Sequence, residues 1–514
     1  MPEKNLIERA GEIQRRLTDE VKSSQGFGSA IDDFDQRIRY VYYVKSGSRV
    51  GTKEIHGVHT RDIHEMELYV HVPFCRKRCT YCCYFSIAEP PDAIVASYVT
   101  SLKRELELLR GTSRFENAVV KHIYLGGGTP TFLEARQLSD LIQSIRSSLT
   151  VLPTLNFTCE VSPESIVSTE GREKLQTLRE NGVNRLSLGV QSFDDGVLEL
   201  IGRGHTSKIA LAAYRNACET GFSNINLDLM FGLPGQDLQS WERDLETATG
   251  LNPVWLSLSR LRFDNPAMDE MQRRRGAIFP DAETSFLMNI MAIEKVTKSG
   301  YQQAHAPGNF RRRCTKKFPP RHWLGQQTLA VGAGAWSYLN GVRYSNVRNL
   351  GRYAALVNEG RLPISSAWEY SELEQMEKET ILMLRLPTGV NRREFDERFG
   401  VDIEQMFIGP WDRLREAGMI TDDGETFRLS YKGLVFAVEV IKQFYSENLM
   451  DKCKNVVYHH PLLRRLFLRA KYTRWVEGLA NLARAASGVS KMGRHRKASP
   501  RAIQGKKQRP EKAC

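Results

Sequence analysis

Three cysteines stand close together in the segment HVPFCRKRCTYCCYF, at Cys75, Cys79 and Cys82. Thiolates separated by three residues and then by two can each bind one iron of a cubane iron–sulfur cluster, whereas a cluster held by cysteines alone requires a fourth thiolate. The fourth iron is then open to a small molecule that binds through an amine and a carboxylate. The spacing therefore predicts an iron–sulfur centre with one open coordination site.

A structural zinc site is the alternative, because zinc prefers four closed nitrogen or sulfur ligands, and Cys83 or His71 could supply the fourth. A second motif favours the cluster. In KHIYLGGGTPTFL a buried-type strand runs into a glycine run at residues 126–128, and glycine lets the backbone approach a bound ligand closely. A glycine run one strand after a cysteine triplet indicates a cluster with a bound ligand.

Together these motifs resemble the radical S-adenosylmethionine (SAM) superfamily, in which the cluster reductively cleaves SAM to a 5′-deoxyadenosyl radical. Over residues 66–445 the resemblance sharpens to the oxygen-independent coproporphyrinogen III oxidase family. It implies a [4Fe–4S] cluster on the three cysteines, and no catalytic side chain is assigned beyond the cluster and SAM sites. It also implies contacts to SAM from Tyr69, Tyr81, Gly127, Glu160 and Trp336.

The same family binds a second SAM beside the first, and the matching positions here are Gly128, Thr129, Gln191, Arg203 and Asp228. Their chemistry suits the task, because arginine can fork onto a carboxylate, aspartate accepts from an amine or a ribose, and glutamine does either. Taken singly, each has a structural alternative, such as a solvated arginine after a helix or an aspartate that caps a turn. Two SAM molecules are therefore expected.

Alternating strand and helix patterns predict the fold. An α/β protein is expected, with an incomplete (βα)6 barrel whose parallel strands carry the chemistry at their carboxyl ends. The motifs quoted above fall at such ends. The expected strands are 67–72, 119–125, 156–161, 185–188, 224–230 and 254–258, and the expected helices are 93–109, 135–149, 173–181, 208–220 and 238–250.

Six regions are expected along the chain. The barrel occupies residues 66–262 and is preceded by an N-terminal extension, 1–65, that lies over it. A segment that closes the cavity follows at 263–370, with AVGAGAWSYLNGVRYSN as its family-like part. Helix, helix and wing-like hairpin patterns then predict a small C-terminal winged-helix-like α+β domain at 371–448. A basic helical segment, 449–487, and a disordered basic tail, 488–514, complete the chain.

Composition limits the class of protein. With 514 residues, 41% hydrophobic and 26% charged, the chain is typical of a globular protein of two or three domains. Its apolar stretches fall short of the roughly 20 residues that a membrane span requires, and the charged N-terminus lacks a signal-peptide core. Of the nine cysteines, four are crowded between Cys75 and Cys83 and the others are scattered singly, which is unlike a disulfide framework. A cytoplasmic protein is expected.

The expected partners are a small-molecule substrate and a reductant protein such as flavodoxin or ferredoxin. Much of the net charge of +13 lies in the C-terminal region, where an acidic carrier protein or an anionic surface could bind. Nucleic acid is not an expected partner, because residues 399–414 carry no row of Lys and Arg that could read a groove.

Two departures from the family decide between its branches. Porphyrinogen oxidases carry a further cysteine where this chain has Tyr84. The heme-chaperone branch has a histidine, asparagine and tyrosine-tryptophan signature, of which RHWLGQQTLAVGAGA keeps only His322 and Trp323. The leading expectation is therefore the branch that transfers a methyl or methylene group from a second SAM to an sp² carbon. A heme chaperone and a decarboxylating coproporphyrinogen III oxidase are the alternatives.

Substitution of single cysteines tests the cluster register. Anoxically reconstituted protein should be brown, and Cys75→Ala, Cys79→Ala or Cys82→Ala should each lose the cluster, because each thiolate binds one iron. Cys83→Ala is the matched control and should keep it. Iron and sulfide analysis with absorbance spectroscopy measures the outcome. Stoichiometric zinc without iron, or cluster loss in Cys83→Ala alone, would contradict the assignment.

Overall fold

The structure is a computed structural model that describes residues 5–22, 48–50, 63–110, 117–261, 278–313 and 327–445. Residues 1–452 form one compact unit, and residues 453–514 form a second unit that lies outside the described residues. The expected basic helical segment and basic tail therefore also fall outside them. No helix among the described residues is long and apolar enough to cross a membrane.

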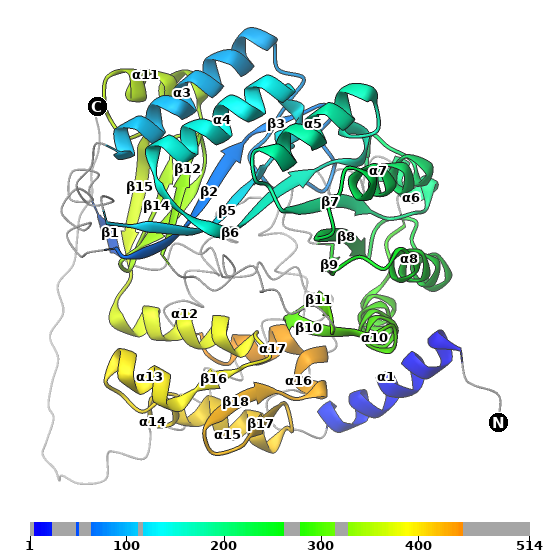
Figure 1. Ribbon diagram of the computed structural model, residues 1–514. Coiled ribbons are helices and arrows are strands. Elements are labelled where there is room, and N and C mark those ends of the chain that lie inside the picture. Colours follow the sequence, from blue (N-terminus) through cyan, green and yellow to red (C-terminus); the bar gives the residue numbers. More distant parts are fainter. Residues whose placement is uncertain are drawn as a thin grey trace, which may run out of the picture. The chain divides into compact units, whose positions relative to one another are not determined.

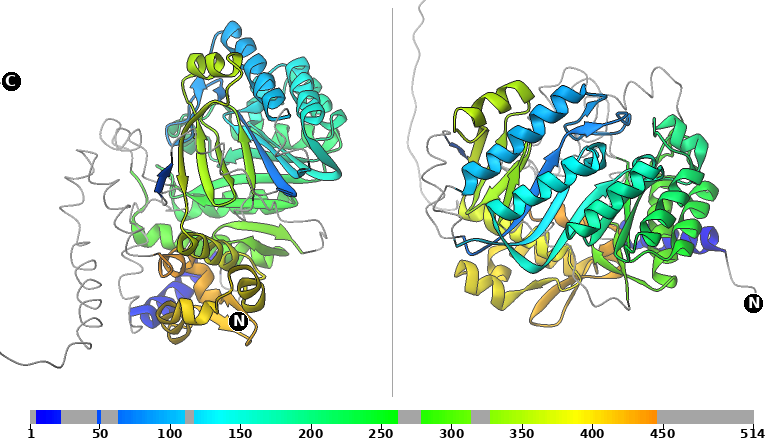
Figure 2. Two further views of the ribbon diagram at one scale, coloured as in Figure 1. Left: turned by 90° about the vertical axis from the view of Figure 1, so that its left-hand side faces the viewer. Right: turned by 45° about the horizontal axis from the view of Figure 1, so that its top comes forward.

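Six parallel strands form the centre of the main sheet, in the order β2, β5, β6, β7, β8, β9. Helices follow the strands and cover one face of the curved sheet (Figure 1, Figure 2). The predicted incomplete barrel is confirmed. The strands are β2 (Glu65–Val72), β5 (Val119–Gly127), β6 (Thr150–Val161), β7 (Arg185–Gln191), β8 (Ile225–Phe231) and β9 (Trp255–Arg260), and the helices are α3 (Asp92–Arg110), α4 (Ala135–Ser148), α5 (Thr169–Glu180), α6 (Asp195–Leu200), α7 (Ser207–Glu219) and α8 (Leu238–Leu251).

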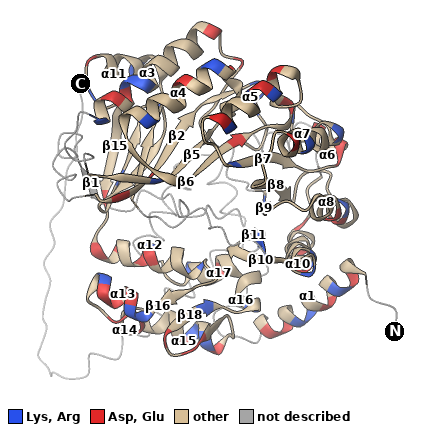
Figure 3. Ribbon diagram, in the orientation of Figure 1, with Lys and Arg blue, Asp and Glu red and all other residues tan. Residues whose placement is uncertain are grey.

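A period of two in side-chain polarity explains why the helices cover only one face. In β7, Leu186, Leu188 and Val190 belong to the same hydrophobic core as the buried leucines of α4 and α5. Arg185 and Ser187 point to the opposite face, because successive strand residues alternate between faces. The concave face of the barrel is therefore polar. Charged residues gather on the helices, and the strands carry few (Figure 3).

The sheet extends beyond the predicted barrel at both edges, to thirteen strands. Strand β12 pairs in parallel with β2, so residues after the barrel supply a seventh parallel strand that periodicity did not predict. The remaining added strands are antiparallel to their neighbours. Beside β12 (Thr328–Val331) lie β13 (Trp336–Leu339), β14 (Val342–Asn346), β15 (Ile364–Glu369) and β1 (Ser48–Val50), while β11 (Asn309–Arg312) and β10 (Tyr301–His305) follow β9, with α10 (Ala282–Lys298) and α11 (Leu350–Asn358) as further helices.

Local capping signals set element ends that periodicity alone misplaced. Helix α5 begins four residues before its expected start at 173, because Ser168 caps it by accepting a hydrogen bond from the Gly171 backbone N–H at 3.0 Å. Helix α6 was not predicted at all. Its six residues follow the cap Asp194, which accepts from the Val197 backbone N–H at 3.1 Å.

The C-terminal domain has the predicted winged-helix-like form. A three-stranded sheet in the order β16, β18, β17 packs with short helices, and the Trp411 ring stacks on the Phe427 ring with centroids 3.9 Å apart. The elements are α12 (Glu372–Leu384), β16 (Val390–Asn391), α13 (Arg392–Phe399), α14 (Ile403–Met406), α15 (Ile408–Glu416), β17 (Ile420–Asp422), β18 (Thr426–Leu429), α16 (Tyr431–Val435) and α17 (Ala437–Lys442).

The N-terminal helix α1 (Leu6–Lys22) lies against α10 and reaches the C-terminal domain. Arg9 Nε is 2.8 Å from Glu294 Oε2 on α10, and the Tyr431 hydroxyl donates to the same carboxylate at 2.8 Å. Lys432 Nζ is 3.3 Å from Glu20 on α1. This part of the N-terminal extension thus packs where the barrel's last helix meets the small domain.

A buried carboxylate fastens the added strands to the barrel. Glu105 on α3 accepts hydrogen bonds from the Gly332 backbone N–H at 2.8 Å, the Asn346 side-chain amide at 2.7 Å and the Tyr353 hydroxyl at 2.5 Å. Burial raises the pKa of Glu105 to about 7, although these three hydrogen bonds oppose the shift. Tyr98, about two turns earlier on α3, accepts from the Ala333 N–H at 3.0 Å.

Replacement of Glu105 by glutamine should destabilise the fold, because the amide group of Gln cannot accept all three hydrogen bonds. A buried donor without a partner costs about 1–3 kcal/mol, and chemical denaturation measures the change in the free energy of unfolding. Glu107→Gln, on the exposed face of the same helix, is the control and should stay within about 0.5 kcal/mol of wild type. Equal stability of the two variants would contradict the role given to Glu105.

Candidate functional site

The cysteine loop, residues 75–86, begins at the end of the first barrel strand. Strand β3 (Phe74–Cys75) pairs in parallel with β4 (Ile87–Ala88) and so brackets the loop. The Cys82 N–H donates to the Cys79 carbonyl at 3.2 Å, which folds the two thiols onto one turn. Both the N–H and the hydroxyl of Thr80 donate to the Ile201 carbonyl at 3.1 Å. The loop is therefore anchored to the segment that follows β7.

The three predicted ligands share one environment, while Cys83 is exposed. Cys75, Cys79 and Cys82 are each half-buried and without a disulfide. The Thr129 hydroxyl donates to the Cys75 sulfur at 3.8 Å, and an Arg203 N–H donates to the Cys79 sulfur at 3.2 Å. Donors aimed at the sulfurs are characteristic of cluster sites, where they tune the bound group.

Burial changes the pKa of two of these thiols. It raises the pKa of Cys82 to about 11, with help from the neighbouring thiols, and it raises the pKa of Cys75 as well. Iron would therefore displace protons on binding. Within the described residues no group of three or more His, Cys, Asp or Glu side chains is arranged to hold a metal ion. The three thiols are thus not gathered around one ion, and the support for a three-cysteine [4Fe–4S] cluster, in which each thiolate binds a different iron, is their spacing on one loop and the two donors directed at Cys75 and Cys79.

His71 supports the loop from behind and is not directed at the sulfurs. Its Nδ1 lies 2.9 Å from the Tyr69 hydroxyl, and its Nε2 lies 3.0 Å from the Phe85 carbonyl. Burial lowers the pKa of His71 to about 4, so the ring is neutral, with Nε2 donating and Nδ1 accepting. Both nitrogens are thus occupied, which argues against the zinc alternative that used His71. Tyr69, predicted as a SAM contact, orients this ring.

Glu160 and the glycine run come together as predicted. The Tyr124 hydroxyl donates to Glu160 Oε1 at 2.6 Å, and the Gly127 N–H donates to Oε2 at 2.9 Å. A Cβ atom at Gly126 would lie 2.7 Å from the same carboxylate, so only glycine fits there. Burial raises the pKa of Glu160 to about 6, against the opposing effect of its hydrogen bonds. A carboxylate is thus presented at the carboxyl end of β6.

The residues expected around a second SAM lie on two sides of the cysteine loop. Thr129 is at Cys75. Across the loop, Arg203 donates to Cys79, to the Tyr81 hydroxyl at 3.4 Å and to the Gly189 carbonyl. Gln191, with a positive φ of 74°, follows Gly189 on β7. Arg203 thus contacts the cysteine loop at Cys79 and at Tyr81. On the other side, Gly128 fits closely, because a Cβ there would lie 2.6 Å from the Phe74 carbonyl oxygen.

Asp228 lies deeper, in a polar network that the sequence did not predict. It accepts from the Ser187 hydroxyl at 2.8 Å and the Asn226 amide at 2.7 Å, and burial raises its pKa. Arg185 is also buried, at 7% exposure, and its Nε has no hydrogen-bond partner within the described residues. Its guanidinium lies 5.4 Å from the centre of the Trp255 ring.

A second arginine approaches the same ring, since the Arg311 guanidinium lies 5.9 Å from its centre. Asn226, Trp255 and Arg311 occupy one register row across β8, β9 and β11. The concave face therefore combines an aromatic ring with two cations. The alternation of polar residues in β7, β8 and β11 could have indicated a polar face. That these residues share one face follows only from the register of the paired strands.

Trp336 lies outside this group, in the added antiparallel strands. Its ring stacks on Trp368 with centroids 5.7 Å apart, and the Arg343 guanidinium lies 4.1 Å from its centre. The ring is thus committed to packing within the sheet extension, and its contact with SAM stays a prediction. His322 and Trp323 lie outside the described residues.

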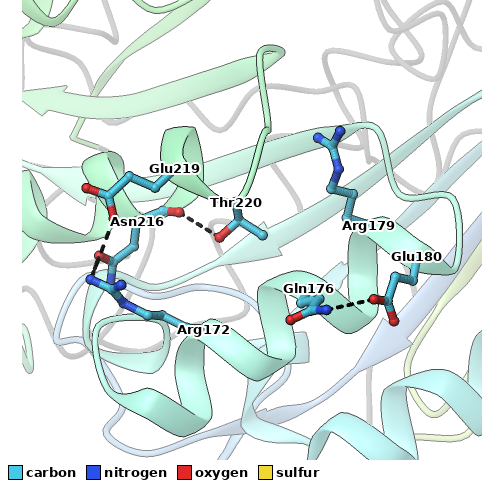
Figure 4. Close-up of a pocket in the computed structure, with 7 residues that line it drawn as sticks. All are labelled: Arg172, Gln176, Arg179, Glu180, Asn216, Glu219 and Thr220. Carbon is cyan, nitrogen blue, oxygen red and sulfur yellow. Dashed lines mark hydrogen bonds and ion pairs between the residues drawn. The ribbon is translucent and has the colours of Figure 1, made fainter.

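A separate pocket lies between α5 and α7 on the helical face (Figure 4). Its charges are mutually engaged: Arg172 Nη2 donates to the Asn216 side-chain oxygen at 2.8 Å and is 3.6 Å from Glu219. Gln176 donates to Glu180 at 2.8 Å. None of the predicted site residues lines it, so it offers positions for control substitutions.

Comparisons with known proteins agree with the motifs. Residues 69–248 match the Radical SAM superfamily model, and residues 370–436 match the HemN C-terminal domain model. The chain is 33% identical to the heme chaperone HemW of Bacillus subtilis (strain 168), over 74% of this chain and 99% of that protein. It is 27% identical to the oxygen-independent coproporphyrinogen III oxidase of Helicobacter pylori (strain ATCC 700392 / 26695), over 74% and 85%. The solved coproporphyrinogen III oxidase (HemN) of Escherichia coli has a TM-score of 0.68 at 23% identity and covers 80% of this chain and 99% of its own, which supports the fold.

Substitution Glu160→Gln tests the carboxylate at β6. The apparent Kd for SAM, measured by anoxic equilibrium dialysis, should rise about tenfold to a hundredfold, because a charged hydrogen-bond partner is lost. The pKa of Glu160 lies near 6, so protonation below that pH should weaken SAM binding by the wild type. The variant should show no such pH dependence, and Glu180→Gln in the separate pocket should behave as wild type. An identical pH dependence in Glu160→Gln would contradict the assignment.

Proposed function

The chain belongs to the radical SAM superfamily, in the family of HemW and oxygen-independent coproporphyrinogen III oxidase, and from this premise we propose that it acts on or carries a tetrapyrrole. Heme binding is the leading form of the proposal. The observation that carries it is the similarity to a heme chaperone over 99% of that relative's length. Membership of the superfamily implies a [4Fe–4S] cluster and SAM.

Different residues at the carboxyl ends of the strands would bind the cluster and SAM. Cys75, Cys79 and Cys82 would hold the cluster. When bound there, the cluster would supply the electron for reductive cleavage of SAM to a 5′-deoxyadenosyl radical. Glu160 would accept hydrogen bonds from SAM while the Gly127 N–H and the Tyr124 hydroxyl fix its carboxylate, as their contacts at 2.9 and 2.6 Å allow. A reductant protein would deliver the electron.

The concave face suits a tetrapyrrole physically. A heme carries a flat aromatic ring and two propionate carboxylates. Arg185 and Arg311, whose guanidinium groups lie near the buried Trp255 ring, offer cations that bind carboxylates. Arg185 retains an unused N–H in the described structure, so a ligand carboxylate would satisfy a buried donor.

Methyl transfer, the leading expectation from sequence, receives less support. The relatives compared above are named heme chaperone or coproporphyrinogen III oxidase and not methyltransferase. A second SAM at Gln191, Arg203 and Asp228 stays a prediction, since Arg203 is already engaged by Cys79 and Gly189. The decarboxylating oxidase remains the second candidate because of the Helicobacter relatives, although Tyr84 stands where such oxidases carry a further cysteine.

Heme titration of the anoxic, cluster-loaded protein tests the leading form. A saturable absorbance band at one heme per chain is expected. Arg185→Met should weaken heme binding about tenfold to a hundredfold, through loss of a charged hydrogen bond, while Arg172→Met in the separate pocket should have no effect. The absence of a saturable band, or equal affinity in both variants, would overturn the heme proposal.

Isotope labelling in the same preparation separates the remaining reactions. With SAM deuterated in its methyl group, a heme carrier should yield little 5′-deoxyadenosine coupled to substrate. Deuterium in that nucleoside, with S-adenosylhomocysteine as coproduct, would instead establish methyl transfer. Unlabelled 5′-deoxyadenosine together with decarboxylation of added coproporphyrinogen III would establish the oxidase.

A further inference from the structure

We propose that the outer surface of the cysteine loop is the docking surface for an acidic electron-transfer protein. The proposal rests on the cluster chemistry of the superfamily and is independent of the substrate. It concerns four cations, Arg76, Lys77, Arg78 and Arg348, which we name the basic collar. All four are exposed. Within the described residues none of them forms an ion pair.

The collar's position over the cluster ligands is the first observation. Arg76, Lys77 and Arg78 fill the whole interval between Cys75 and Cys79. Binding of these two thiols to a cluster would therefore also fix the backbone of the three cations. Arg348 arrives from a distant part of the chain, because Gly334 lies against both the Arg348 side chain and the Phe85 ring. Three of the four cations thus lie between two predicted cluster ligands, and the fourth lies beside Phe85 at the far end of the same loop.

The rigidity of the loop is the second observation. Thr80 is fixed by two hydrogen bonds to Ile201, Cys79 by the Arg203 guanidinium, and the far end of the loop by the contact of His71 with Phe85. A fixed array of charges loses little conformational freedom on docking, which favours a specific complex.

The charges on the collar are not neutralised nearby. Arg76 lowers the pKa of Glu170, but Lys174 is the main cause of that shift, and its ammonium lies 2.6 Å from the Glu170 carboxylate. The collar therefore presents a net positive field to solvent. Fields of this kind steer an oppositely charged protein into productive encounters.

An apolar contact completes the surface. Tyr84 is 64% exposed and directly follows the exposed Cys83. Exposed tyrosines surrounded by charges are common at the centres of protein interfaces, where their rings supply contact area. Docking on Tyr84 would bring the partner's cofactor against the cysteine loop. The partner would lose one electron, which would reduce the bound cluster from the 2+ to the 1+ state, and no proton or group would be transferred.

Charge reversal on the loop tests the proposal without SAM or substrate. Stopped-flow absorbance would follow cluster reduction by two probes, a reduced acidic ferredoxin and reduced methyl viologen. For the triple variant Arg76→Glu, Lys77→Glu, Arg78→Glu, the second-order rate constant with ferredoxin at low salt should fall about tenfold or more. Added salt should slow the wild type and not the variant. Reduction by methyl viologen, a small cation, should not slow.

A matched control separates local docking from net charge. The triple variant Arg110→Glu, Arg136→Glu, Arg215→Glu makes the same change at exposed arginines on α3, α4 and α7 and should react with ferredoxin as wild type does. An equal loss in this control, or a salt-independent wild-type rate, would overturn the proposal.

Arg348→Glu tests the docking surface without a change in the cysteine loop, since Arg348 lies far from the cysteines in sequence. If the triple loop variant binds less iron than wild type, the single variant Arg348→Glu is the test of the docking surface. Its rate with ferredoxin should fall about threefold with full iron content, and an unchanged rate would reject the docking surface. Slower reduction by methyl viologen as well as ferredoxin, at full iron content, would also reject it.

Discussion

The imidazole of His71 is the point on which the geometry of the site depends. The ring links the Tyr69 hydroxyl to the Phe85 carbonyl through hydrogen bonds. The backbone carbonyl of His71 accepts a hydrogen bond from the Tyr98 hydroxyl at 2.7 Å. Burial keeps the ring neutral, so that one nitrogen donates while the other accepts. Strand β2, helix α3 and the far end of the cysteine loop are thereby held in one arrangement. The close approach of Gly127 and Gly332 to His71 fixes two further segments against it.

Two buried carboxylates also join different parts of the structure through hydrogen bonds. Glu105 and Glu160 are both buried, and burial raises the pKa of each. Each is held by neutral donors from other segments: a glycine N–H and a tyrosine hydroxyl in both cases, and an amide as well at Glu105. A carboxylate accepts from several directions at once, so it can align segments that share no secondary structure. Glu105 does so for the sheet extension, whereas Glu160 on β6 joins two donors of the neighbouring strand β5 beneath the glycine run.

Sequence alone predicted the parts of the fold that follow local rules. The six barrel strands have period-two or continuous apolar patterns, and the cysteine spacing and glycine run are contiguous in the chain. Strand β12 could not be predicted in the same way, because Thr328–Val331 is too short to show a period and its partner β2 lies more than two hundred residues earlier. Asp228 was predicted only as a SAM contact, and its neighbours Arg185 and Trp255 were missed for a related reason. Arg185 and Trp255 are unremarkable within their own strands, and the three residues meet only across the register of the sheet.

The pairing of β12 with β2 has a consequence for biosynthesis. The cysteine loop follows strand β2, and one of the two strands that pair with β2 is β12. The hydrogen bonds to Glu105 come in part from Asn346 and Tyr353, which lie later still in the chain. A ribosome must therefore synthesise well over half of the chain after the cysteines before their supporting structure can form. Contacts so distant in sequence form late in folding. A cluster on Cys75, Cys79 and Cys82 would therefore be assembled after translation of the barrel and its extension.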